Sequence, residues 1–115
     1  MDPLAAIAHW PSDRRVLALH SGRHDPTWSR WSLLASPTAT YRFLAERGGR
    51  SELAGGADLP GIELTHDPFA DLDALRAWPG LWIGYLGYDL GRWVETLPRR
   101  AADDRGWPII ELGYC

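Results

Sequence analysis

The sequence contains no lysine; all twelve of its basic side chains are arginines, and we attach no function to this bias. Cysteine occurs once, at Cys115, so no internal disulfide can form, which is typical of a reducing compartment such as the cytoplasm. No apolar run approaches the roughly 20 residues that a membrane-spanning helix needs, and the N-terminal apolar stretch is too short for a secretory signal. A surplus of basic residues is also absent, because the formal net charge is −3. We therefore expect a cytoplasmic protein that binds neither a membrane nor nucleic acid, whose phosphates require excess cations.

The residues that are present have an ordinary globular balance with an excess of tryptophan. Hydrophobic residues make up 45% of the chain and charged residues 23%, which favours a packed core over disorder. The 115 residues suffice for one domain. The seven tryptophans are the unusual feature, and each is a candidate for the core or for a binding surface.

Two Asp-Pro pairs predict the helices. Asp2-Pro3 and Asp67-Pro68 each place an N-cap residue and a proline before an apolar stretch, and Pro79-Gly80 is expected to end the second helix. In that helix Phe69, Leu72 and Leu75 recur at spacing three and predict a stripe that lies on a sheet, while Asp71 and Asp73 suit the positive end of its dipole.

Short apolar stretches between turn residues predict the strands. Residues 38–45 alternate apolar and polar side chains, as a half-buried strand does, whereas the continuous apolar run 16–20 indicates a strand covered on both faces. The hairpin-like spacing favours an α+β fold with a mainly antiparallel sheet. The predicted strands are 16–20, 31–35, 38–45, 50–53, 81–88 and 107–114; the predicted helices start at 4 and 68, with a helical turn at 88–95.

No combination of residues indicates a self-contained active site. His20 and His24 are four residues apart beside Asp25, but the Ser-Gly pair between them interrupts any helix, so the spacing does not indicate a metal site. Cys115 has no neighbouring base to activate its thiol, and Asp103-Asp104 lies in a polar stretch typical of a solvated loop. We expect no catalytic residue, no metal and no cofactor on these residues.

Three glycines at 84, 87 and 91 follow one another in the 81–95 stretch. Their spacing matches neither the dinucleotide-binding nor the P-loop pattern, and no lysine follows to reach a phosphate. Close packing of the backbone against an aromatic-rich neighbour is the simpler interpretation.

One segment, residues 19–31, has the composition of a small-ligand pocket. Ser21 and Gly22 end a predicted strand, and Trp28 and Trp31 return into the next one, so backbone groups, a hydroxyl and two flat apolar rings come together. This combination suits a small amphipathic or aromatic ligand such as an amino acid. The alternative is that both tryptophans belong to the core.

Two motifs resemble the chorismate-utilising enzymes. The first is Leu19-His20-Ser21-Gly22, followed by Ser29-Arg30-Trp31 and Ser36-Pro37, which resembles the opening pattern of that family. The second is similar to the family's Gly-x-x-Gly-Tyr-Asp signature, with Pro108 and the Glu111 region behind it. Its residues, to which we assign a structural role, are Gly84, Gly87, Tyr88, Asp89, Gly91 and Arg92.

Within the family, the Leu-His-Ser-Gly and Gly-Tyr-Asp-Leu-Gly-Arg stretches resemble aminodeoxychorismate synthase component I; anthranilate synthase component I more often has Leu-Glu-Ser. The resemblance implies that residues 1–115 are the noncatalytic N-terminal region of a longer enzyme. That enzyme would convert chorismate to 4-amino-4-deoxychorismate for folate synthesis, with ammonia from a glutamine amidotransferase partner. Its Mg²⁺-dependent chorismate-binding domain would follow C-terminally. Anthranilate synthase component I and a free-standing small-ligand binding module remain the alternatives.

The resemblance also implies a tryptophan pocket and a way of packing. By position, Leu19, His20 and Ser21 would line one side of the pocket, and Trp28, Trp31 and Ser32 the other. His20 replaces the glutamate of feedback-inhibited anthranilate synthases and the two tryptophans are bulky enough to fill the site, so we expect weak or no tryptophan binding. The family's two sheets pack nearly orthogonally and draw on both halves of its chain. Residues 1–115 alone are therefore expected to self-associate or to expose a tryptophan-rich face.

Overall fold

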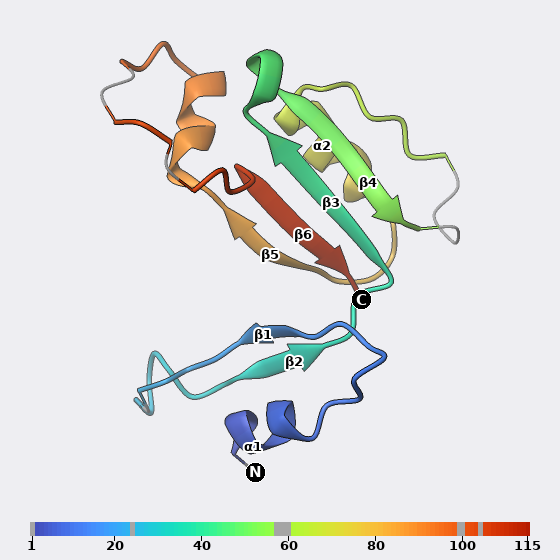
Figure 1. Ribbon diagram of the computed structural model, residues 1–115, viewed down its shortest axis with the longest axis vertical. Helices are drawn as coiled ribbons and strands as arrows, with labels where there is room; N and C mark the ends of the chain where they lie inside the picture. The colour runs from blue at the N-terminus through green and yellow to red at the C-terminus, as the bar shows by residue number, and fades with distance from the viewer. Residues whose placement is uncertain (1, 24, 57–60, 99–100, 104) are drawn as a thin grey trace.

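The computed structural model describes every residue except 1, 24, 57–60, 99–100 and 104, and it shows two antiparallel sheets with a few short helices (Figure 1). A two-stranded sheet pairs β1 with β2, and a four-stranded sheet has the order β4-β3-β6-β5. This confirms the predicted α+β class with antiparallel pairing. The elements are α1 (Pro3–Ala8), β1 (Leu17–Leu19), β2 (Leu33–Ala35), β3 (Ala39–Leu44), β4 (Arg50–Gly55), α2 (Pro68–Leu75), β5 (Trp82–Leu86), β6 (Ile110–Tyr114) and two 3₁₀ helices, η1 (Glu46–Gly48) and η2 (Tyr88–Trp93).

Both Asp-Pro pairs start the helices as predicted. The Asp2 carboxylate accepts from the Leu4 amide at 3.1 Å, and Asp67 accepts from the Phe69 amide at 2.9 Å. The second helix ends at Leu75, one turn before the predicted stop at Pro79. Within the described ranges, no helix combines the length and the apolar character that crossing a bilayer requires.

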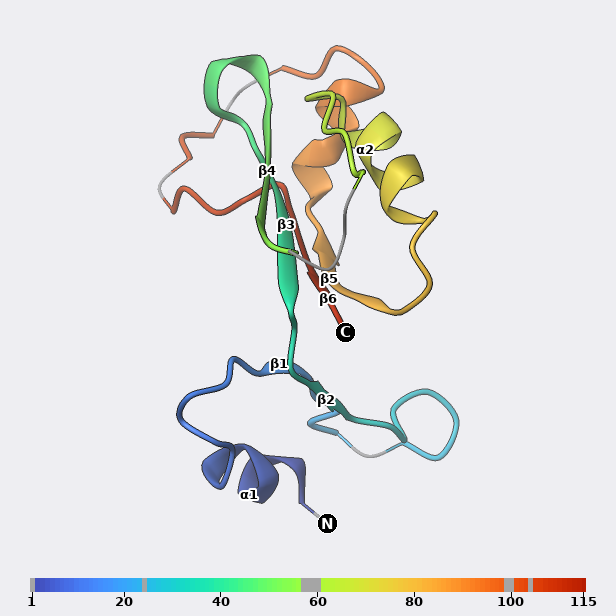
Figure 2. The same cartoon turned by 90° about the vertical axis from the view of Figure 1, so that its right-hand side faces the viewer.

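The hydrophobic core lies between the four-stranded sheet and α2, which covers one face of that sheet (Figure 2). Tyr41 and Phe43 of β3, Leu75 of α2 and Ile110 of β6 are buried and in contact. Leu72 also packs against this cluster, but Phe69 is 44% exposed. The predicted apolar stripe is therefore right for its last two members and wrong for Phe69, which lies in the first turn, outside the contact with the sheet.

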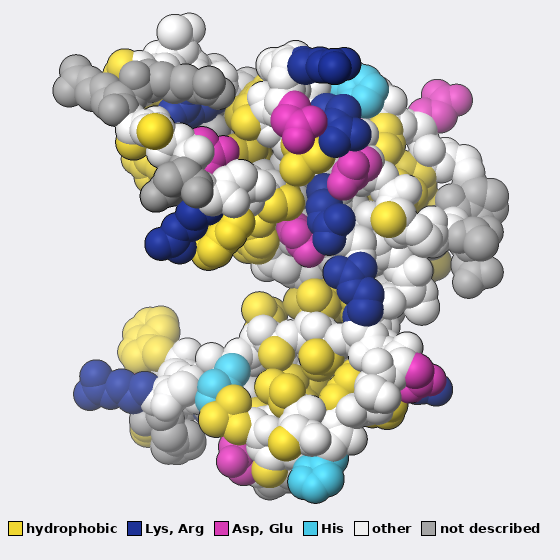
Figure 3. Space-filling view, in the orientation of Figure 1, with side chains coloured by type: hydrophobic (Ala, Val, Ile, Leu, Met, Phe, Trp, Pro, Cys, Tyr) yellow, Lys and Arg dark blue, Asp and Glu magenta, His cyan; other side chains and the backbone are white. Residues whose placement is uncertain are grey.

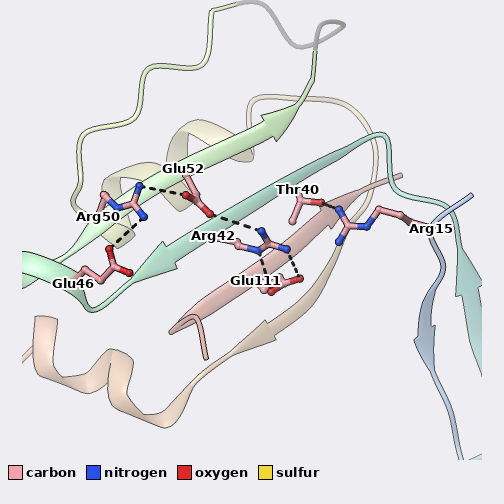
Figure 4. A network of polar contacts seen from close by, with 7 residues as sticks. All are labelled: Arg15, Thr40, Arg42, Glu46, Arg50, Glu52 and Glu111. Carbon is pink, nitrogen blue, oxygen red and sulfur yellow. Dashed lines mark hydrogen bonds and ion pairs between the residues drawn. The ribbon is translucent and has the colours of Figure 1, made fainter. Parts of the chain in front are cut away.

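The opposite face of the four-stranded sheet carries charged side chains (Figures 3 and 4). Arg42 in the central strand β3 pairs with Glu111 of β6 at 3.2 Å and with Glu52 of β4 at 3.8 Å. Arg50 continues the row through Glu52 at 3.4 Å. The hydrogen bond to Glu111 raises the pKa of Arg42. Opposite charges on neighbouring strands thus support the sheet register, each pair contributing up to about 1 kcal/mol.

The β1–β2 hairpin meets the end of this charged face. Arg15, just before β1, donates to Thr40 Oγ1 at 3.0 Å, and Leu17 lies so close to Gly113 of β6 that a Cβ there would be 2.3 Å from its methyl group. Leu19, two residues further along, is 51% exposed. The prediction that 16–20 is covered on both faces is therefore wrong, because contact with the larger sheet ends near Leu17. The two sheets meet at one end, and their nearly orthogonal packing stays a prediction.

Candidate functional site

The first motif forms a cluster around the Ser32 hydroxyl at the loop end of the β1–β2 hairpin. The Ser32 hydroxyl lies 3.0 Å from the Ser21 amide, whose hydrogen bond it accepts, and 3.2 Å from Nδ1 of His20. The Ser21 hydroxyl in turn donates to the Trp31 carbonyl oxygen. The structure therefore brings His20, Ser21 and Ser32 into contact, with Leu19 next to them on the strand; that they line the two sides of a pocket stays a prediction. These contacts hold the two chain segments side by side where the strand pairing ends.

The two tryptophans of this segment point to solvent. Trp28 is 89% exposed and Trp31 is 80% exposed, so the interpretation of both as core residues is wrong, and their rings do not fill a pocket. Asp25 shapes the intervening turn, because its carboxylate accepts from the amides of Thr27 at 2.8 Å and Trp28 at 2.9 Å. The hydrogen bond from Trp28, followed by that from Thr27, lowers the pKa of Asp25. The exposure of these rings agrees with the predicted tryptophan-rich face; a tryptophan pocket and self-association remain predictions.

The second motif begins in β5, where glycine permits close contact with β6. A Cβ at Gly84 would lie 1.9 Å from the Glu111 carbonyl oxygen, and the Gly87 amide donates to the Ile109 carbonyl oxygen at 2.6 Å. The predicted close packing of the backbone at these two positions is thus confirmed. The neighbour, however, is the backbone of β6 and of Ile109 just before it, and not an aromatic side chain. A Cβ at Gly91 would meet only a Leu97 methyl group, at 3.3 Å.

The rest of the second motif forms η2 and opens onto a cavity. The 3₁₀ helix matches the predicted helical turn at 88–95. Arg92 Nε pairs with Asp89 at 3.4 Å across one turn, and Tyr88 is 96% exposed. Gly87, Tyr88, Asp89 and Arg92 all line a cavity of about 730 Å³ between η2 and the segment that leads to β6.

The remaining sequence candidates are the histidines, the Asp103-Asp104 pair and Cys115. His24 and Asp104 lie outside the described residues. In the part of the chain that is described, no three His, Cys, Asp or Glu side chains are close enough to hold a metal ion. Cys115 is a free thiol, and burial raises its pKa, which disfavours the reactive thiolate.

A buried carboxylate cluster beneath β3 and β4 was not predicted. Asp71 of α2 is fully buried and accepts from Tyr41 Oη at 2.9 Å, from the Ser51 hydroxyl, and from the Thr65 amide at 2.7 Å. Desolvation, more than the nearby Asp71 charge, raises the pKa of Tyr41. The sequence signal was the polar Ser51 and Thr65 upstream of the helix start, and it becomes meaningful only once the fold brings these residues to Asp71. We assign this cluster to the structure, because it joins α2 to the sheet away from both motifs.

Comparison with known proteins supports the family resemblance. The chain is 31% identical to anthranilate synthase component 1 of Mycobacterium tuberculosis and to that of Mycobacterium bovis, and 29% identical to that of Mycolicibacterium smegmatis. The matches cover 96% of this chain and 23–24% of each relative, so the chain spans about a quarter of their length. No protein-family model matches the chain, and no solved structure matches it significantly. Over nearly all of its length, this chain is therefore similar to part of a longer enzyme, anthranilate synthase component 1.

Proposed function

We propose that these residues form the noncatalytic N-terminal region of a chorismate-utilising enzyme of the cytoplasm, most specifically aminodeoxychorismate synthase component I. The observation that carries the proposal is similarity along 96% of the chain to a quarter of a longer enzyme, anthranilate synthase component 1. The two motifs add support, because at each of them the structure uses a particular residue type. In the first motif, Ser32 joins the two segments that leave the paired strands β1 and β2. In the second, only glycine fits at position 84 against the β6 backbone.

The enzyme-level properties belong to this proposal. The activity would transfer ammonia, delivered by a glutamine amidotransferase subunit or domain, to chorismate. Mg²⁺ would act in a chorismate-binding domain outside these residues. The chain's own role would be to support that domain. The Ser21–Ser32 cluster is the vestige of a tryptophan pocket in this proposal, with His20 engaged by Ser32.

Anthranilate synthase component I is the second candidate, and the names of the four similar proteins favour it. The Leu-His-Ser-Gly and Gly-Tyr-Asp-Leu-Gly-Arg stretches favour aminodeoxychorismate synthase. The two enzymes differ in product, so the product decides between them.

The test is to incubate the full-length enzyme with chorismate, Mg²⁺ and ammonium and to separate the products by chromatography. We expect 4-amino-4-deoxychorismate, which a lyase converts to 4-aminobenzoate. Anthranilate, recognised by its fluorescence and retention time, would assign the second candidate. Consumption of no chorismate by a folded enzyme, with glutamine and the amidotransferase supplied, would refute both and leave the small-ligand binding module.

A further inference from the structure

We propose that the cavity beside η2 is a binding site for a small aromatic molecule with a single carboxylate. This cavity of about 730 Å³ is lined by η2 and by the segment before β6. In Figure 1, η2 lies at the end of the four-stranded sheet that is remote from the β1–β2 hairpin. The cavity is thus separate from the Ser21–Ser32 cluster. The inference rests on the cavity's lining and does not depend on the proposed function. Its volume falls within the range of about 300–1,000 Å³ typical of small-molecule sites.

Aromatic side chains form the walls of the cavity. Trp93 is fixed from behind, because its ring packs edge-on against Phe43 of the core with 4.9 Å between centroids. Tyr85 is held by its hydroxyl, which donates to the Pro108 carbonyl oxygen at 2.9 Å. Trp107 and Tyr88 line the same cavity and remain 64% and 96% exposed. Two fixed and two exposed rings around one hollow would bury a flat apolar ligand, and the exposed pair would lose contact with water on binding.

Two arginines give the cavity its charge preference. Arg92 has only 24% of its side chain exposed, and it pairs with Asp89 through Nε. The hydrogen bond that it donates to Asp89 comes from Nε. Arg105 places its guanidinium carbon 5.1 Å from the Trp107 ring centroid, a cation–π contact that leaves the N–H edge of the guanidinium available.

The carboxylates that line the cavity are already engaged by the chain. Asp89 accepts from Arg92, and one oxygen of Asp103 accepts from the amides of Arg105 at 3.3 Å and Gly106 at 2.9 Å. One oxygen of each acid is thus engaged, while the guanidinium groups supply the charged donors of the cavity, whose planar fork matches a carboxylate. Because these two acids offset the two arginines, the lining has no net positive charge; a carboxylate would be held by guanidinium donors at short range, and a ligand with several negative charges would not be favoured.

The test is calorimetric titration of the full-length protein with 2-naphthoate, using neutral 2-naphthamide as the matched probe. We expect naphthoate to bind at least about tenfold more tightly than naphthamide, since a carboxylate–guanidinium contact contributes more than 1.4 kcal/mol. Arg92→Gln and Arg105→Gln should each remove most of that preference. Arg30→Gln, which changes an exposed arginine on the hairpin turn, should leave it unchanged.

Equal affinity for the two probes would overturn the proposal, and so would no naphthoate binding at millimolar concentration. An unchanged preference in Arg105→Gln would also overturn it. If Arg92→Gln does not fold once the pair with Asp89 is gone, its circular-dichroism signal will be lost. The naphthoate preference of Arg105→Gln, a change at an exposed residue, then decides the test. Neither probe is a substrate in the proposed reaction, so failure here leaves the proposed function standing, and absence of chorismate turnover leaves this site standing.

Discussion

The buried carboxylate of Asp71 supplies the most demanding prediction. Replacing it with asparagine keeps the shape but turns one oxygen into a donor. That oxygen position faces either the hydroxyls of Tyr41 and Ser51 or the amide and hydroxyl of Thr65, at 2.7 and 3.0 Å, all of which donate to Asp71 in the native protein. With the amino group toward Thr65, the Thr65 amide faces another donor; with it toward Tyr41 and Ser51, their hydroxyls must reverse and accept from it. In either orientation the hydrogen bonds to a charged acceptor are lost or weakened.

The magnitude follows from the hydrogen bonds lost. A hydrogen bond to a charged group contributes about 1.5–3 kcal/mol, and an unpaired buried donor costs about 1–3 kcal/mol. Because such terms are not additive, we expect Asp71→Asn to lower the free energy of unfolding by about 3–5 kcal/mol. That is a large part of the roughly 5–15 kcal/mol that stabilises a typical domain.

Urea denaturation followed by circular dichroism measures this loss. Asp73→Asn is the matched control, because Asp73 is on the same helix, has 78% of its side chain exposed and forms only a surface pair with Arg76; we expect a change within about 0.5 kcal/mol. Tyr41→Phe should cost much less in the Asp71→Asn background than in the native protein. A difference below about 1 kcal/mol between the Asp71 and Asp73 variants would refute the assignment of this carboxylate as the link between α2 and the sheet.

Two further predictions concern the same sheet. Gly84→Ala should destabilise the protein by about 2 kcal/mol or more in the same urea assay, because its Cβ would lie 1.9 Å from the Glu111 carbonyl oxygen. Gly22→Ala, whose Cβ would meet no atom closer than 3.9 Å, should be nearly neutral, and equal losses in the two variants would contradict the close packing. Alkaline pH should also destabilise the protein, because desolvation raises the pKa of Tyr41 above the ordinary value of 10.0. The unfolded chain therefore releases this proton first, so the contribution is fully present below pH 10 and is lost as the pH rises toward the folded-state pKa. Tyr41→Phe should reduce the decline measured by denaturation between pH 9 and 11 (about the ordinary tyrosine range), and an unchanged slope would argue against a buried phenol.

Local sequence signals predicted local structure well in this chain. Asp2 and Asp67 determine where the helices begin, because a carboxylate that accepts from the first amides acts within three residues. Likewise the alternation around Tyr41 and Phe43 predicted β3 and its buried face. These are short-range effects, so neighbouring residues contain the necessary information.

The site predictions divided along the same line. Ser21 and Ser32 were assigned to opposite sides of a pocket, which stays a prediction; the structure shows a direct hydrogen bond between them, because β1 and β2 pair on one side of the loop that connects them. Trp28 and Trp31 are exposed although their side chains are apolar. Their exposure depends on how far the hairpin extends beyond the larger sheet, which no local pattern contains.

The sequence by itself determined the element types, the helix starts, the antiparallel class and the family resemblance. Only the tertiary structure decided that Asp71, in the first turn of α2 as predicted, is also a buried acceptor, because Ser51 and Thr65 reach it from outside its own helix. It also decided that η2 and the segment before β6 enclose a cavity, since residues 88–92 and 105–109 meet only when β5 and β6 pair. The physical reason is the same for both: burial and hydrogen-bond partnership depend on contacts between residues distant in the chain, whereas capping and alternation depend on neighbours.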